Sequence, residues 1–238
     1  MKKYELTNNS KTVFGKKLFQ IRALVDFWNV KAGNLGGYIE KEENLSQCDE
    51  AWVYDNAKVF GDAMVSDNAQ VYGHALVYSH ANVSGHAEVY GNAMVYDTAK
   101  VYGNTLVHGN AMIHGDANIH GYARVHDDAE VHGDVDIYGN ANVYGNANIR
   151  GNTKICGNAN ITSNARIISD ADLLQITGLG SSHRTTTVYR TKNGIEIVCG
   201  CFRGDLEEFR TRVIETRKDK VRDEYLKFAE LIEIYFRL

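Results

Sequence analysis

Residues 51–74 read AWVYDN-AKVFGD-AMVSDN-AQVYGH, and the same six-residue unit continues without a change of phase to Ile176. The stretch contains 21 units, in which the third position is always aliphatic and the first is alanine in all but three. Two apolar positions separated by one outward residue have the period of a β-strand, and the Gly-Asn or Asp-Asn pair that ends many units favours a tight corner. Short strands joined by corners at a fixed period predict a β-solenoid.

The spacing of small and aliphatic residues adds to this prediction. An aliphatic residue followed four positions later by a small one resembles the hexapeptide pattern of left-handed parallel β-helices. In that fold three units form one coil, so the resemblance implies about seven coils of 18 residues. We expect an all-β solenoid with an N-terminal cap in residues 1–36, a left-handed parallel β-helix in residues 37–176, and a C-terminal β-hairpin and two-helix module in residues 177–238.

The N-terminal region combines a hairpin with a glycine-rich segment. Residues 13–24 (VFGKKLFQIRAL) have a Gly-Lys turn between apolar residues, which predicts a small hairpin. Residues 26–47 (DFWNVKAGNLGGYIEKEENLSQ) resemble the N-terminal region of a bacterial and prophage hexapeptide-repeat family, whose members are usually labelled acetyltransferases or polymer-forming proteins. The chain has Asn29 where that family often has Asp and Tyr38 where it often has Trp. The resemblance implies an architecture and leaves the activity open.

Stacking of coils every 18 residues sorts the outward side chains into three faces. The second face, named after the second unit of the repeat, carries these apolar residues in consecutive coils: Phe60, Leu76, Tyr78, Met94, Tyr96 and Met112. An apolar outward patch of this size is expected to be covered. The two candidates for the cover are another subunit, with a trimer favoured by the resemblance, and the C-terminal helices folded back onto the face.

Histidines recur every six residues from His108 to His132. Residues six apart lie on different faces, so only His108 with His126 and His114 with His132 are stacked neighbours. We predict no metal site, because two histidines without a carboxylate bind a metal weakly. In one interpretation each histidine replaces an outward tyrosine as a surface aromatic. In the other they belong to a ligand or partner surface, for which the candidates are His108, His114, Arg124, His126, His132, Arg150 and Arg166.

The resemblance also suggests candidates for catalysis. In hexapeptide acyltransferases a histidine near the subunit junction acts as general base, which makes His114 and His132 the candidates here. The cofactor would then be acetyl-CoA, and Arg150 and Arg166 are the best candidates for its phosphates. No loop interrupts the 21 units, however, whereas enzymes of this architecture commonly use an inserted loop to form the pocket. The sequence therefore favours a chain without catalytic residues or a cofactor.

The C-terminal residues predict a compact module. Two alternating strands in residues 185–191 and 195–201 flank Asn193-Gly194, which is a strong hairpin pattern. Acidic residues at 205–208 predict the start of one helix, and an apolar stripe over residues 219–236 predicts another. The stretch TVYRTKNGIEIVCGCFRGDLEEF resembles a module appended to phage-encoded repeat proteins. Cys199 and Cys201 are expected to be small buried residues.

Charge and composition narrow the choice of partners and compartment. The net charge is −4, and residues 51–176 alone contribute −7, so nucleic acid is a poor partner because phosphate binding needs clustered Lys and Arg. Four scattered cysteines, no apolar leader and no apolar run of about 18 residues predict a cytoplasmic protein without a membrane span. Proline is absent, as expected where most backbone N–H groups enter strand ladders.

These patterns favour a non-catalytic binding protein. Given the resemblances, we expect an oligomeric protein of phage or prophage origin in the bacterial host cell. Its ligand would be a host protein or a small nucleotide signal, and its effect the inhibition of a host defence system. The alternatives are an acyltransferase that uses acetyl-CoA and a structural scaffold.

Overall fold

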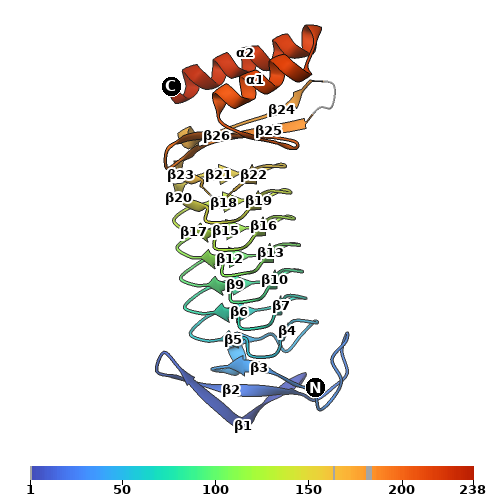
Figure 1. The fold of residues 1–238 in the computed structure, drawn as a ribbon. Helices are drawn as coiled ribbons and strands as arrows, with labels where there is room; N and C mark the ends of the chain where they lie inside the picture. The colour runs from blue at the N-terminus through green and yellow to red at the C-terminus, as the bar shows by residue number, and fades with distance from the viewer. Residues whose placement is uncertain (1, 163, 181–183) are drawn as a thin grey trace.

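The computed structural model describes residues 2–162, 164–180 and 184–238 of the chain. The repeat forms a parallel β-solenoid of about 7 coils, with a β-hairpin at its N-terminal end and a small sheet with two helices at its C-terminal end (Figure 1). The predicted β-solenoid is therefore confirmed. Its coils fit the left-handed parallel β-helix that we expected.

Each six-residue unit supplies one strand to one of the three faces. The first face consists of β4 (Trp52–Val53), β7 (Gln70–Val71), β10 (Glu88–Val89), β13 (Leu106–Val107), β16 (Arg124–Val125), β19 (Asn142–Val143) and β22 (Asn160–Ile161). The second face consists of β5 (Lys58–Val59), β8 (Leu76–Val77), β11 (Met94–Val95), β14 (Met112–Ile113), β17 (Glu130–Val131), β20 (Asn148–Asn152) and β23 (Arg166–Ser169). The third face consists of β6 (Met64–Val65), β9 (Asn82–Val83), β12 (Lys100–Val101), β15 (Asn118–Ile119), β18 (Asp136–Ile137) and β21 (Lys154–Ile155).

The alternation of side chains within each unit builds the core. Strands on one face pair in parallel at an offset of 18 residues, so that Val95 lies beside Ile113. Val95 and the first-position Ala93 are 0 % exposed, as are their equivalents in almost every coil. Thr105 replaces alanine at one first position and is also buried, where its Oγ1 donates a hydrogen bond to the Tyr102 carbonyl at 3.2 Å. The polar exception is thus compatible with the apolar core.

The corners between strands depend on the fifth residue of each unit. From Asp55 to Gly157 this residue has a positive φ and is usually glycine, with aspartate at four corners and serine at Ser79. The sixth-position asparagines, such as Asn92 and Asn110, follow these corner residues and do not themselves have a positive φ. The Asn92 amide instead donates to the Asn110 side chain at 3.1 Å, which links neighbouring coils.

The N-terminal cap extends the sheet of the second face. Strands β1 (Tyr4–Val13) and β2 (Lys16–Ala23) form an antiparallel hairpin. It begins at Tyr4, earlier in the chain than the predicted hairpin, which begins at Val13. Strand β2 also pairs with β3 (Leu35–Ile39), and β3 pairs in parallel with β5. A Cβ atom on Gly36 would lie 2.5 Å from the Val53 carbonyl oxygen, so only glycine permits this approach. The 3-10 turn Glu42–Asn44 follows.

Aromatic side chains close the N-terminal end of the solenoid core. The ring of Trp52 is 1 % exposed and lies 6.0 Å from the ring of Tyr4 and 5.3 Å from that of Phe27, measured between centroids. The Tyr4 hydroxyl donates to the carbonyl of Leu45 at 2.7 Å, and burial raises its pKa. The cap therefore covers the open end with apolar surface while its one buried hydroxyl is satisfied.

The C-terminal module starts before the repeat pattern ends. After the 3-10 turn Asp170–Asp172, β24 (Leu173–Leu179) leaves the solenoid and pairs antiparallel with β25 (Arg184–Thr191), although its first residues still follow the six-residue pattern. Strands β25 and β26 (Gly194–Cys199) form the predicted hairpin, and β27 (Phe202–Gly204) completes a four-stranded sheet.

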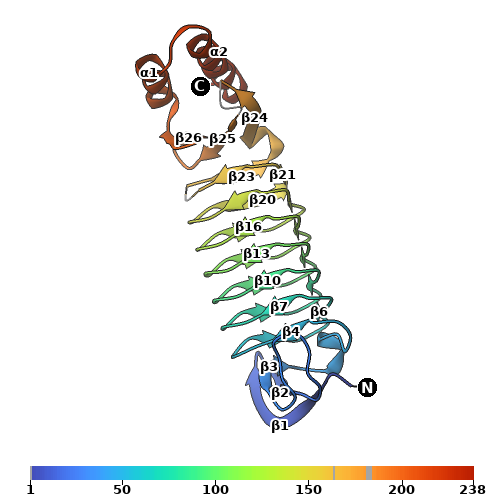
Figure 2. The same ribbon diagram turned by 90° about the vertical axis from the view of Figure 1, so that its right-hand side faces the viewer.

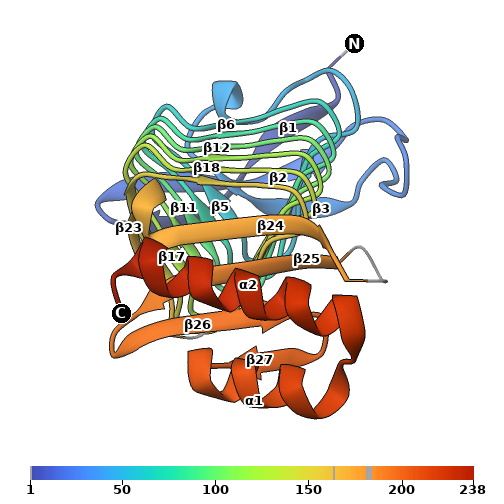
Figure 3. The ribbon, with the colours of Figure 1, turned by 90° about the horizontal axis from the view of Figure 1, so that it is seen from above.

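Two helices cover the outer side of this sheet. They are α1 (Leu206–Thr216), which Asp205 caps through a capping box with Glu208, and α2 (Asp219–Phe236). Phe209, Phe228 and Ile232 are buried between the helices and the sheet. Figures 1 and 2 show both helices beyond the C-terminal end of the solenoid, and Figure 3 shows them lying over strands β24–β27.

The position of the helices corrects one expectation. We considered that they could fold back to cover the second face, but their apolar sides face the four-stranded sheet instead. The second face is therefore not covered by the C-terminal module. Among the described residues, neither helix is both long and apolar enough to cross a membrane.

Candidate functional site

The outward side chains form columns because the coils stack in register. On the second face, the rings of Phe60, Tyr78, Tyr96, His114 and His132 stack with successive centroid distances of 5.0, 4.9, 4.6 and 4.8 Å, and neighbouring planes differ by 4–6°. We call this set the second-face column. Each ring is held between its neighbours, so the column is a rigid surface whose side chains have little rotational freedom left to lose on binding.

An apolar row lies beside this column. Leu76, Met94 and Met112 occupy adjacent positions on β8, β11 and β14. All three are half-buried, because each is shielded by its neighbours in the row and the column. The structure thus brings together the six predicted interface residues on one face.

The N-terminal hairpin covers only one end of that face. Phe14 at its tip lies 6.1 Å from the rings of both Phe60 and Tyr78, and Phe60 is 5 % exposed. Phe14 itself is 74 % exposed, and with Lys16 and Gly61 it lines a shallow apolar groove. In the part of the chain that the structure describes, no other element lies over Met94 or Met112.

The first face carries a second column. Tyr72, Tyr90, His108, His126 and Tyr144 stack with centroid distances of 4.6, 4.7, 4.8 and 5.1 Å. The Tyr72 hydroxyl donates to Glu88 Oε2 at 2.7 Å, and burial together with this carboxylate raises the tyrosine pKa. We call this set the first-face column.

Histidines in the two columns have different polar neighbours. His126 Nδ1 lies 3.1 Å from Asp127 Oδ1. His114 lies between two carboxylates, with Nδ1 3.6 Å from Asp97 Oδ2 and Nε2 3.5 Å from Glu130 Oε1. Burial lowers the pKa of His132, and a positive charge on His114 lowers it further. Both ring nitrogens of His114 therefore have a carboxylate nearby.

The ring geometry argues against a metal bound by a stacked histidine pair. Equivalent nitrogens on parallel rings with centroids 4.8 Å apart point in the same direction, as in His108 and His126. Two histidine nitrogens bound to one zinc ion at about 2.1 Å lie at most about 4.2 Å apart. No group of three or more potential metal ligands exists among residues 2–162, 164–180 and 184–238.

The predicted arginines do not form one site. Arg124 is exposed on the first face beside the first-face column, in register with Leu106 and Asn142. Arg150 follows His132 at the end of the second-face column, and Arg166 is exposed on the next strand. The Arg150 Nε atom is buried without a hydrogen-bond partner among the described residues. The predicted ligand surface is thus divided between two faces, with His108, Arg124 and His126 on the first.

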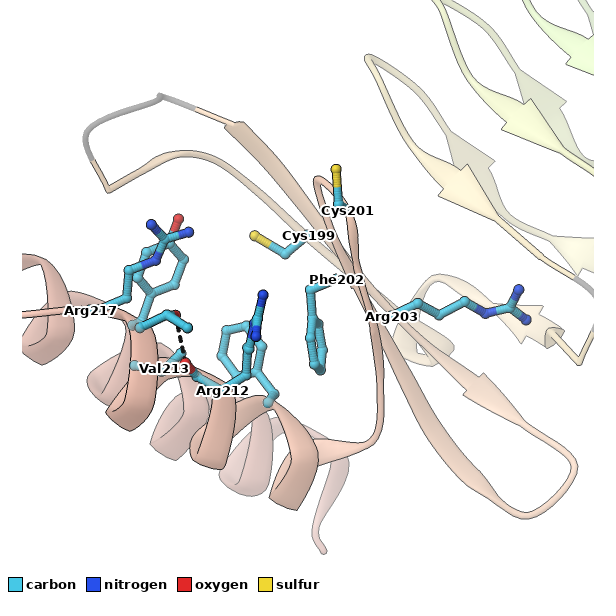
Figure 4. A pocket seen from close by; sticks show the side chains of 10 residues that line it. Cys199, Cys201, Phe202, Arg203, Arg212, Val213 and Arg217 are labelled. Carbon is cyan, nitrogen blue, oxygen red and sulfur yellow. Dashed lines mark hydrogen bonds between the residues drawn. The ribbon is translucent and has the colours of Figure 1, made fainter.

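A cavity in the C-terminal module was not predicted. It has a volume of about 400 Å³ and lies between α1 and the turn from β26 to β27. Figure 4 shows the side chains of Arg212 and Arg217 on one side and the thiols of Cys199 and Cys201 on the other. Cys199 is buried as expected, but Cys201 is exposed because it lies in the turn rather than in the strand. Sequence spacing does not indicate this site, because the pairing of α1 with β26 and β27 creates it.

Comparison with known proteins supports the repeat architecture and assigns no site. Residues 57–73 match the family model described as the YdcK β-solenoid repeat. No curated protein sequence matches the chain significantly. The match is confined to residues 57–73, and it supports the repeat that the structure shows as a parallel β-solenoid.

Proposed function

We propose that this β-solenoid is a non-catalytic binding protein that works as a homo-oligomer, with a trimer favoured, and presents its aromatic columns to a partner. The observation that carries the proposal is the second face. Leu76, Met94 and Met112 form an apolar row beside a continuous column of rings, and the N-terminal hairpin reaches only its first rings. Outward apolar patches that no other element covers mark association surfaces on proteins.

The regularity of the coils favours binding over catalysis. From Ala51 to Thr162, where every residue is described, no inserted loop interrupts the units. An inserted loop is the usual way for this architecture to form a recess that buries an acceptor and a coenzyme. Stacked tyrosines and histidines offer apolar contact together with a hydrogen-bonding edge, which suits recognition of another protein.

The biological setting of the proposal comes from the sequence resemblances. A phage or prophage protein with these properties would act in the cytoplasm of the bacterial host, where it would inhibit a defence system by holding a host protein. A small nucleotide signal is the alternative ligand, and a scaffold without any ligand is the simplest alternative role.

A capture experiment tests the proposal. The full chain is immobilised and exposed to lysate of a bacterial host, and bound proteins are identified in parallel with small molecules released from the purified oligomer. A specific host protein should be retained by the wild type and lost when Tyr90 and His108 of the first-face column are changed to Ser. The matched control changes Tyr102 and Tyr138 of the third face. Recovery of neither a protein nor a metabolite would count against the binding function.

One observation favours catalysis as the second candidate. His114 lies between Asp97 and Glu130, and a histidine oriented by a carboxylate is the usual form of a general base. The acyltransferase alternative would use this histidine with acetyl-CoA near Arg150. Calorimetry should then detect acetyl-CoA binding, and release of free coenzyme A should stop in the His114→Gln variant. Absence of binding to the oligomer would remove this candidate.

A further inference from the structure

The cavity of the C-terminal module has a strongly one-sided charge. Among the described residues that line it are Arg203, Arg212 and Arg217, and none of these described residues is an aspartate or glutamate. Arg203 forms an ion pair with Glu196 and points away from the cavity toward the solenoid (Figure 4). Two guanidinium groups therefore remain to give the cavity its positive charge.

Neither of these two groups is neutralised within the described residues. Arg212 and Arg217 form no salt bridge there, although both are on an acidic chain with many available carboxylates. The Arg217 guanidinium lies 5.7 Å from the centroid of the Tyr225 ring, which holds it at the cavity wall. Arg217 also follows the last turn of α1, where a cation offsets the negative end of the helix dipole. Arg212 has no such local role, so its position is the more informative one.

The remaining walls are aromatic and fixed. Phe209 is 3 % exposed and lies 5.4 Å from Phe202 and 6.0 Å from Tyr225, in edge-to-face contacts. Phe202 is only partly buried, so it presents ring surface to the cavity. A volume of about 400 Å³ accommodates a ligand with a flat ring and a small charged group.

We propose that this cavity binds a nucleoside phosphate, with the phosphate between Arg212 and Arg217 and the base against Phe202. Guanidinium groups match phosphate oxygens through paired hydrogen bonds, and a base can stack on an aromatic wall. The described residues that line the cavity all lie between Cys199 and Tyr225. The site is therefore separate from the columns and from the second face, and its failure would leave the proposed binding of a partner protein at the columns untouched.

Binding of nucleoside monophosphates to the full chain is the first test. Calorimetry with each common nucleoside monophosphate should show binding that weakens with added salt, and the Arg212→Gln variant should bind about ten-fold more weakly or worse. The matched control is Lys227→Gln, which removes an exposed cation on α2 and should leave nucleotide binding unchanged. The unphosphorylated nucleoside and inorganic phosphate alone should each bind more weakly than the nucleotide. Equal binding of inorganic phosphate, or an unchanged affinity in Arg212→Gln, would overturn the proposal.

The thiols supply a second readout that does not depend on a variant. Cys201 lines the cavity and is exposed, while Cys48 is exposed near the N-terminal cap. Saturating nucleoside monophosphate should slow the reaction of Cys201 with a maleimide several-fold and leave the rate at Cys48 unchanged. Equal rates at Cys201 with and without nucleotide would contradict binding in this cavity.

Discussion

The imidazole rings of His114 and His132 stack with their centroids 4.8 Å apart and their planes 6° from parallel. Burial within this stack lowers the pKa of His132, and so does a positive charge on His114. The pKa of His108 is lowered in the same way, by burial and then by His126. His108 and His132 therefore favour the neutral imidazole at a pH where the unfolded chain already binds protons.

Acid should destabilise the protein through these rings. The folded chain protonates His132 only below the ordinary histidine pKa of about 6.5, so the unfolded chain binds more protons in that pH range. The unfolded state is therefore stabilised relative to the folded state as the pH falls. We expect the urea midpoint to be constant above about pH 7 and to decrease from about pH 6.5 downward. His132→Gln should reduce this decrease, whereas His86→Gln at an exposed corner should not. An equal decrease in wild type and His132→Gln would contradict the role of the stack.

Self-association should depend on the apolar row of the second face. Changing Leu76, Met94 and Met112 to Ser removes the contact surface, so the mass measured by light scattering should fall to that of one chain. The control changes Met64 and Tyr122, which are 41 % and 63 % exposed elsewhere on the solenoid, to Ser and should keep the oligomer. A wild-type monomer, or a triple variant of unchanged mass, would rule out this interface.

Close packing at the corners should make glycine hard to replace. Gly85 has a φ of +66°, and a Cβ atom there would lie 2.8 Å from the Gly103 nitrogen. Gly85→Ala should lower the free energy of unfolding by about 1–3 kcal/mol. Gly15 in the hairpin has a similar φ of +77° but nothing within 4 Å, so Gly15→Ala should cost less. Urea denaturation of the two variants compares them, and equal losses would show that the contact adds nothing.

The inward and outward positions of a strand should respond oppositely to charge. Val101 is 0 % exposed, and Val101→Asp would place an unpaired carboxylate in the core at a cost of several kcal/mol, comparable with the total stability of a domain. The variant should be insoluble or unfolded by circular dichroism. Lys100→Asp, one residue earlier and exposed, should fold normally. A cooperative unfolding transition in soluble Val101→Asp would be incompatible with this core.

The repeat made most of the solenoid predictable. Pairing at an offset of 18 residues follows from a local pattern, because the inward aliphatic residue fixes both the phase and the neighbour of each strand, as with Val95 and Ile113. Helix α2 was also predicted at its observed bounds, because its apolar stripe and its length are local properties.

Features that depend on distant pairing were not predictable. Leu173 keeps the six-residue pattern, yet β24 pairs with β25 because the four-stranded sheet closes the end of the core with Tyr189. The cavity was missed for the same reason, since Arg212 and Cys201 meet only after α1 has packed on this sheet. The sequence predicted the corner but did not single out its fifth residue as the one with positive φ, because glycine, aspartate and the neighbouring asparagine share that tendency.

Uniform pairing from β4 to β22 has a consequence for how this protein can vary in length. Insertion or deletion of 18 residues would change the separation of the two terminal modules by one strand spacing, about 4.8 Å, and leave their relative rotation unchanged. Deletion of one six-residue unit would instead rotate the C-terminal module by roughly a third of a turn about the solenoid axis, because each coil has three faces. The solenoid is thus a spacer whose length can be adjusted in fixed steps, and the orientation of its two ends survives only whole steps.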